Sequence, residues 1–304
     1  MPIYLPPISR RNFLRRTALS AAALALAPAV RAADLAKPTD QNTFAFFSDT
    51  HIAADPRTIS RGVNMTDNLT ATVKDFLAWP VNPALVLVNG DLAVESGQPG
   101  DYKAFGHLIS AARTTTPVRL SLGNHDDRAH FRHAFPDDAT AEDIGEHRQV
   151  AFFSSEHANW FQLDSLQKTD STPGELGAAQ LDWLSRQLAA HPEKPAIIVG
   201  HHNLITSIEN LGLIDTVALE DIFAKNPQVK AYIYGHTHDW HITRHGSGVH
   251  LINLPPTAYV FKTGRPSGWV RATIAPDGAE FELRCLDRQH PEHGQIKKVQ
   301  WRTA

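Results

Sequence analysis

The chain of 304 residues contains one cysteine, Cys285, so no disulfide bond can form within it. It also lacks an excess of positive charge, with a formal net charge of −3. The first 32 residues hold five arginines and no acidic residue, which leaves 24 basic and 32 acidic residues, a net charge of −8, in the remainder. This balance excludes a general electrostatic attraction to nucleic acids or anionic membranes, so no stable association with either is expected.

Histidine is the one residue type in surplus, with 17 copies. It is the commonest side-chain metal ligand, so the surplus directs attention to metal-binding patterns. No low-complexity tract or linker divides residues 33–304, and we expect them to form one domain.

The N-terminal 32 residues have the features of an export signal. Residues 9–15, with Arg10-Arg11 at their centre, resemble the twin-arginine signal. The apolar stretch Ala18–Val30 is too short to span a bilayer, and Val30-Arg31-Ala32 offers small residues for cleavage. We expect a signal peptide over residues 1–32, recognition by the twin-arginine export machinery and a periplasmic or secreted protein. An ordinary secretory signal or an anchored N-terminus is the alternative.

Five short runs of apolar residues each end abruptly in polar residues. Their length and their content of valine, isoleucine, leucine and aromatic residues are typical of buried β-strands. The runs are Thr43–Phe47, Ala84–Val88, Val118–Leu122, Ala196–Val199 and Ala231–Tyr234.

Segments with helical spacing of apolar residues lie between these strands, at Asn68–Trp79, Tyr102–Arg113, Gly177–Ala190 and Val217–Lys225. Alternating strands and helices predict a layered α/β fold. In such folds ligands bind beyond the carboxyl ends of the strands, so the five polar ends should meet at one rim.

Residues 249–304 have a different pattern. Val249–Leu254, Trp269–Ile274 and Ala279–Leu286 are predicted strands, and Pro276-Asp277-Gly278 joins the last two as a hairpin. We interpret them as a second, mostly antiparallel sheet packed against the first. Ala54–Thr66 and Asp137–His147 are predicted loops that could shape the mouth of a site.

The polar strand ends supply carboxylate, imidazole and amide donors without any thiolate. This mixture suits iron, manganese or zinc. Two ions about 3.5–4 Å apart can clamp a phosphoryl oxygen while a bridging hydroxide attacks phosphorus. One ion could not use all seven candidate ligands, which are Asp49, His51, Asp91, Asn124, His201, His236 and His238.

These residues lie in five blocks that resemble, in order, the motifs of the calcineurin-like metallophosphoesterases. The blocks are Asp49-Thr50-His51, Gly90-Asp91, Gly123-Asn124-His125-Asp126, Gly200-His201-His202 and Gly235-His236-Thr237-His238. Each block alone is weakly specific, but five together at strand ends are a specific pattern. The resemblance implies two transition-metal ions and a four-layer fold in which a two-sheet β-sandwich is flanked by α-helices.

The resemblance also implies a role for each residue. The first ion would be bound by Asp49, His51 and His238, and the second by Asn124, His201 and His236. Asp91 would bridge the two ions. His125 would contact the phosphate or protonate the leaving group. His202 is left open between a structural role and a substrate contact, and Asp126 between orienting His125 and capping the following segment.

The paired His201-His202 block resembles the branch of cyclic-nucleotide and glycerophosphodiester phosphodiesterases. Val94 stands where purple acid phosphatases place a metal-binding tyrosine, which disfavours that branch. We therefore expect hydrolysis of small phosphodiesters, with a phosphomonoesterase as the nearest alternative. A non-catalytic metal-binding protein and an exported nuclease are further alternatives. The sequence does not indicate the oligomeric state.

Overall fold

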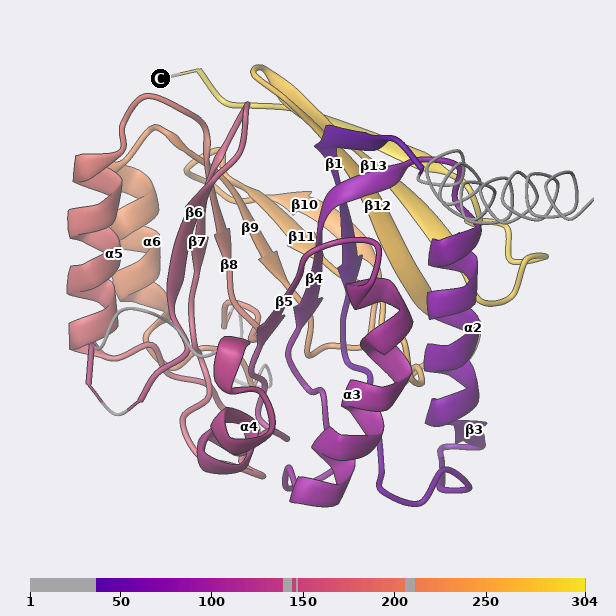
Figure 1. Cartoon of the computed structure of the whole chain (residues 1–304). Helices are drawn as coiled ribbons and strands as arrows, with labels where there is room; N and C mark the ends of the chain where they lie inside the picture. The colour runs from indigo at the N-terminus through magenta and orange to yellow at the C-terminus, as the bar shows by residue number, and fades with distance from the viewer. Residues whose placement is uncertain (1–36, 139–143, 146, 206–210, 304) are drawn as a thin grey trace, which may run out of the picture. The chain divides into compact units, whose positions relative to one another are not determined.

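The computed structural model describes residues 37–138, 144–145, 147–205 and 211–303, so the expected signal peptide lies outside the described residues. The unit from Thr39 onward contains two six-stranded sheets, with helices on the outer side of each (Figure 1). The α/β fold with a two-sheet sandwich flanked by helices is therefore confirmed.

The first sheet has the strand order β14-β13-β12-β1-β4-β5. Its parallel strands are β1 (Thr39–Phe47), β4 (Asn82–Asn89) and β5 (Val118–Ser121). Its antiparallel strands are β12 (Gly268–Ala275), β13 (Gly278–Cys285) and β14 (Ile296–Gln300).

The second sheet has the strand order β10-β11-β9-β8-β7-β6. Its parallel strands are β7 (Asn159–Gln162), β8 (Ala196–Val199), β9 (Val229–Tyr234) and β11 (His250–Asn253). The antiparallel edge strands are β6 (Ala151–Ser154) and β10 (His241–Arg244).

Alternating side chains explain why both faces of β1 are buried. Phe44 and Phe46 point to the core between the sheets, and Phe44 packs against Trp160 of β7 with ring centroids 4.6 Å apart. Ala45 and Phe47 point to the helices on the other face. A strand that is covered on both faces has a continuous run of apolar residues, which is why β1 could be predicted from the sequence.

Helices α2 (Met65–Ala78), α3 (Pro99–Arg113) and α4 (Arg128–Ala134) pack on the first sheet, and α5 (Ala178–Ala190) and α6 (Thr216–Lys225) on the second (Figure 1).

Asn64 caps α2 by accepting a hydrogen bond from the backbone N–H of Asp67, and Gln98 and Asp101 form a capping box on α3. A short hairpin, β2 (Ile59–Ser60) and β3 (Val63–Asn64), precedes α2, and a 3₁₀ turn, Pro136–Asp138, follows α4. Among the described residues no helix has the length and apolarity needed to cross a membrane.

The prediction that the strands of residues 249–304 form a separate second sheet is wrong. Strand β11 pairs in parallel with β9, whereas β12 pairs antiparallel with β1, so the C-terminal strands extend both sheets. Apolar alternation identifies a strand but not its neighbour, because pairing depends on contacts distant in sequence. The five polar strand ends consequently come from two sheets. Similarly, the predicted loop Ala54–Thr66 contains the β2–β3 hairpin and the first two residues of α2.

Candidate metal centre

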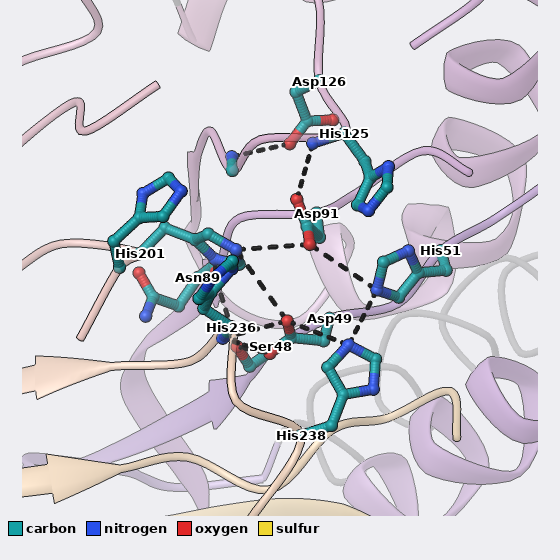
Figure 2. Close-up of polar contacts among 12 residues, drawn as sticks. Ser48, Asp49, His51, Asn89, Asp91, His125, Asp126, His201, His236 and His238 are labelled. Carbon is teal, nitrogen blue, oxygen red and sulfur yellow. Dashed lines mark hydrogen bonds and ion pairs between the residues drawn. The ribbon is translucent and has the colours of Figure 1, made fainter. Parts of the chain in front are cut away.

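All seven candidate ligands follow the carboxyl end of a parallel strand. Asp49 and His51 follow β1, Asp91 follows β4, and Asn124 follows β5. His201 follows β8, while His236 and His238 follow β9. The side chains from both sheets point toward one another (Figure 2).

The carboxylate and imidazole ligands form two groups that share Asp91. In each group the potential ligand atoms lie within 4.8 Å of one another. The first group is Asp49, His51, Asp91 and His238, and the second is Asp91, His201 and His236. The first group supports binding of a divalent metal ion. The division matches the one implied by the motif resemblance, and the role of each residue as a ligand stays a prediction.

Asn124 fits a ligand position beside these groups. Its side chain is only 4% exposed, and its Oδ1 atom is buried without a hydrogen-bond partner in the described structure. A buried amide oxygen left without a partner is costly, and a bound cation would remove that cost. The oxygen and nitrogen donors around it fit manganese, iron or zinc.

The backbone at the site is held in an unusual conformation. Five of the seven candidate ligands have positive φ angles, namely Asp49 (51°), His51 (47°), Asp91 (48°), His236 (67°) and His238 (52°). Such conformations cost free energy and persist where the surrounding structure enforces them. Backbone hydrogen bonds from Asp49 N–H to Gly90 O (3.2 Å) and from His51 N–H to Asp91 O (2.9 Å) tie the two strand ends together. The ligand atoms are therefore positioned in advance of binding.

Three of the site histidines are ready to bind a metal because they are neutral. Burial lowers the pKa of His51 to about 3, that of His236 to about 3 and that of His238 to about 4. The Nε2 atoms of His51 and His238 lie 3.0 Å apart. His51 Nε2 is also 3.6 Å from Asp91 Oδ2, and His238 Nε2 is 3.4 Å from Asp49 Oδ1. Ring nitrogens and carboxylate oxygens that converge in this way make a cation site.

Backbone carbonyls orient three of the imidazoles. His201 donates from Nδ1 to Asn89 O (2.9 Å), so its Nε2 faces Asp91 Oδ2 at 3.2 Å. His238 donates from Nδ1 to Tyr259 O (2.5 Å), and His236 donates from Nε2 to Leu211 O (3.0 Å). Each bond leaves the other ring nitrogen free to act as a ligand.

The pKa of His201 differs from those of the other site histidines. Burial opposes its charged form, but the adjacent Asp91 carboxylate raises the pKa to about 9. A metal ion beside Asp91 would displace this proton on binding.

His125 lies next to the shared carboxylate. Its backbone N–H donates to Asp91 Oδ1 (2.9 Å), and its Nδ1 donates to Glu95 O (2.7 Å). The side chain is 29% exposed, so its Nε2 remains available to a bound substrate. This position is compatible with the predicted contact to phosphate or leaving group.

His202, in contrast, is fully buried, and its Nδ1 lies 2.7 Å from Ser165 Oγ. Its ring packs against His236 at 4.5 Å. His202 is therefore enclosed behind His236 and has no exposed surface.

Asp126 has a structural role that the sequence left open. Its carboxylate accepts hydrogen bonds from the backbone N–H groups of Gly123 (2.9 Å), Leu92 (3.2 Å) and Ala93 (3.2 Å), which fastens the ends of β4 and β5 together. Burial raises its pKa to about 7. The cap of α4 is the next residue, Asp127. Because Asp126 and Asp127 are adjacent and chemically identical, the sequence alone does not show which of them caps the helix and which joins the strand ends.

Comparisons with known proteins agree with this geometry. A family model described as calcineurin-like phosphoesterase matches residues 43–240. The chain is 30% identical over 252 residues to the 3′,5′-cyclic adenosine monophosphate phosphodiesterase CpdA of Escherichia coli K12, covering 78% of this chain and 84% of that protein. It is 28% identical over 228 residues to a 3′,5′-cyclic-nucleotide phosphodiesterase of Nostoc sp. PCC 7120, covering 73% and 80%.

Among solved structures, a dimetal phosphatase from Danio rerio has the same fold, with a TM-score of 0.66, 16% identity, and coverage of 86% of this chain and 99% of that one. The family match spans most of the described chain and includes all the candidate ligands. The chain belongs to the calcineurin-like phosphoesterase family and is a metal-dependent phosphoester hydrolase.

Proposed function

We propose that this protein hydrolyses small phosphodiesters, including nucleoside 3′,5′-cyclic monophosphates, at a centre of two metal ions. The observation that carries the proposal is the pair of ligand groups that share Asp91. The relatives in Escherichia coli and Nostoc are cyclic-nucleotide phosphodiesterases, which supports a diester substrate.

The residues would act as follows. Asp49, His51 and His238 would hold one ion, and His201, His236 and Asn124 the other, with Asp91 between them. When bound, the ions would neutralise phosphoryl charge and supply a nucleophilic oxygen from water near neutral pH. His125, held by the carbonyl of Glu95, would donate from Nε2 to a phosphoryl oxygen or to the departing alkoxide. The bonds of Asp126 to three backbone amides keep this arrangement rigid.

A comparison of two chromogenic substrates separates this proposal from a phosphomonoesterase at the same site. With Mn²⁺ added, kcat/KM for bis(p-nitrophenyl) phosphate should exceed that for p-nitrophenyl phosphate by roughly tenfold or more. A diester carries one negative charge and presents two ester oxygens, so a site that places His125 beside the departing oxygen favours it. Equal or faster turnover of the monoester would contradict the diester preference. Release of adenosine monophosphate from cyclic adenosine monophosphate is the matching natural assay.

We also propose that residues 1–32 direct export by the twin-arginine pathway. An exported enzyme would meet phosphodiesters outside the cytoplasm, so its physiological role would be to scavenge nucleotides or glycerophosphodiesters. Changing Arg10 and Arg11 together to lysine should leave the full-length protein in the cytoplasmic fraction, while the unchanged chain is recovered from the periplasm or medium. Equal export of both forms would contradict the pathway, as an ordinary secretory signal tolerates lysine in its basic region.

A further inference from the structure

Three side chains with no role in the proposed mechanism form a cluster beside the metal centre. The Arg61 guanidinium lies 4.8 Å from the ring centroid of Phe261 and 5.7 Å from that of Tyr259. The two aromatic rings are 6.2 Å apart. We call Arg61, Tyr259 and Phe261 the Arg61 cluster.

The Arg61 cluster adjoins the first ligand group directly. The Phe261 ring stacks on His238 at 4.1 Å with planes 14° apart, and the Tyr259 ring stacks on His51 at 5.1 Å with planes 25° apart. A substrate whose phosphate occupies the metal centre would therefore place its next chemical group near these rings.

The backbone around the cluster is firmly held. Arg61 and Gly62 form the two-residue turn of the β2–β3 hairpin, with φ angles of 49° and 79°, as expected of a turn that matches the twist of the strands. The Ser60 side chain lies near the Tyr259 hydroxyl. On the other side, the Tyr259 carbonyl accepts from His238 Nδ1. The cluster is thus a rigid surface attached to the ligand group.

Exposure and charge indicate what this surface binds. Phe261 is 48% exposed, an unusual state for a phenylalanine, and Arg61 is exposed beside it. In the described part of the chain no carboxylate lies within ion-pair distance of Arg61. An exposed aromatic ring with a planar, unpaired guanidinium stacks well on a planar, electron-rich ring, and nucleobases are bound in this way.

We propose that the Arg61 cluster is the nucleobase subsite of the enzyme, which makes nucleoside phosphodiesters its preferred substrate class. The inference rests on the proposed phosphodiesterase function and adds the part of the substrate that lies away from phosphorus. The base stacks on the surface that Arg61 and Phe261 present, while the phosphate lies at the metal centre. The cluster contributes to substrate binding and leaves the chemical step to the ligand groups and His125.

The test compares two ligands that differ only in the base. Calorimetry on the metal-loaded protein should show adenosine 5′-monophosphate binding about tenfold more tightly than ribose 5-phosphate, since stacking of one base is worth this order of affinity. Phe261→Leu, which keeps apolar bulk against His238, should reduce the ratio to about twofold or less, and Phe261→Tyr should retain it. Ile59→Ala, on the same hairpin and at a residue 67% exposed, is the matched control and should change neither affinity.

Kinetics distinguish a base subsite from mere support of His238. For cyclic adenosine monophosphate, Phe261→Leu should raise KM about tenfold and leave kcat and metal content near wild type. Lost metal, or an equal fall in kcat for every substrate, would show that Phe261 only supports the ligand and would overturn the proposal. A wild-type protein without preference for the base-containing ligand, including one that binds neither, would also overturn it. Failure of the proposed function is separate, because it would appear as no turnover of bis(p-nitrophenyl) phosphate.

Discussion

Replacing Asp91 with asparagine should lower kcat/KM for bis(p-nitrophenyl) phosphate by about a thousandfold or more. Asp91 belongs to both ligand groups, and its Oδ2 lies 3.2 Å from His201 Nε2 and 3.6 Å from His51 Nε2. Asparagine has nearly the same shape but no negative charge. The substitution therefore removes the charge that holds two cations close together without removing the bulk of the side chain.

Metal analysis of the same samples identifies the cause of the loss. The variant should bind less than the wild-type complement of metal, and treatment of the wild-type protein with a chelator should produce a comparable loss that Mn²⁺ restores. Asp182→Asn, at an exposed residue of α5, is the matched control and should retain full activity. Unchanged hydrolysis by the Asp91 variant with metal still bound would rule out a mechanism that depends on two ions.

Gly123→Ala should reduce activity at least about a hundredfold and lower the free energy of unfolding by about 1–3 kcal/mol. A Cβ atom at this position would contact Asp91 Oδ1 and would lie 2.5 Å from Asp91 N and 2.7 Å from His201 Nε2. The shared carboxylate and one imidazole would both have to move. Asp91 N is a backbone atom, and the two side-chain atoms belong to buried candidate ligands, so the strand ends cannot adjust without losing the ligand geometry.

The control is the same change where there is space. Gly246 has no heavy atom within 4 Å of an added Cβ and no positive φ angle, so Gly246→Ala should alter the unfolding free energy by less than about 0.5 kcal/mol. Denaturant titration measures both stabilities, and the diesterase assay measures both rates. A Gly123→Ala protein with wild-type metal content and rate would show that the strand ends are more adaptable than these contacts imply.

The elements that position the centre could be predicted from the sequence because each is buried on both faces or is strongly periodic. The run Ala196–Val199 coincides with β8, and the predicted helix Tyr102–Arg113 begins only three residues after α3 begins. The polar residues after such strands must lie at a sheet edge, so the seven candidate ligands were recognisable. The resemblance to known motifs then divided them into two groups.

The features that the sequence did not reveal depend on contacts between distant residues. Strands β6 and β7 are not predicted from the sequence, although Trp160 and Phe161 of β7 are buried, because the two strands hold only three and two consecutive apolar residues. The choice of β9 as the neighbour of β11 is set by packing. The Arg61 cluster joins residues about 200 positions apart, and no local pattern marks Phe261 as a neighbour of His238.

The position of the ligands across two sheets has a mechanical consequence. Each ligand group takes residues from both sheets: His238 joins Asp49 and His51, while His201 and His236 join Asp91. An ion in either group would cross-link the two sheets at the carboxyl ends of their strands. Sliding of one sheet over the other would then break the coordination, so the affinity for the metal would depend on the alignment of the sheets.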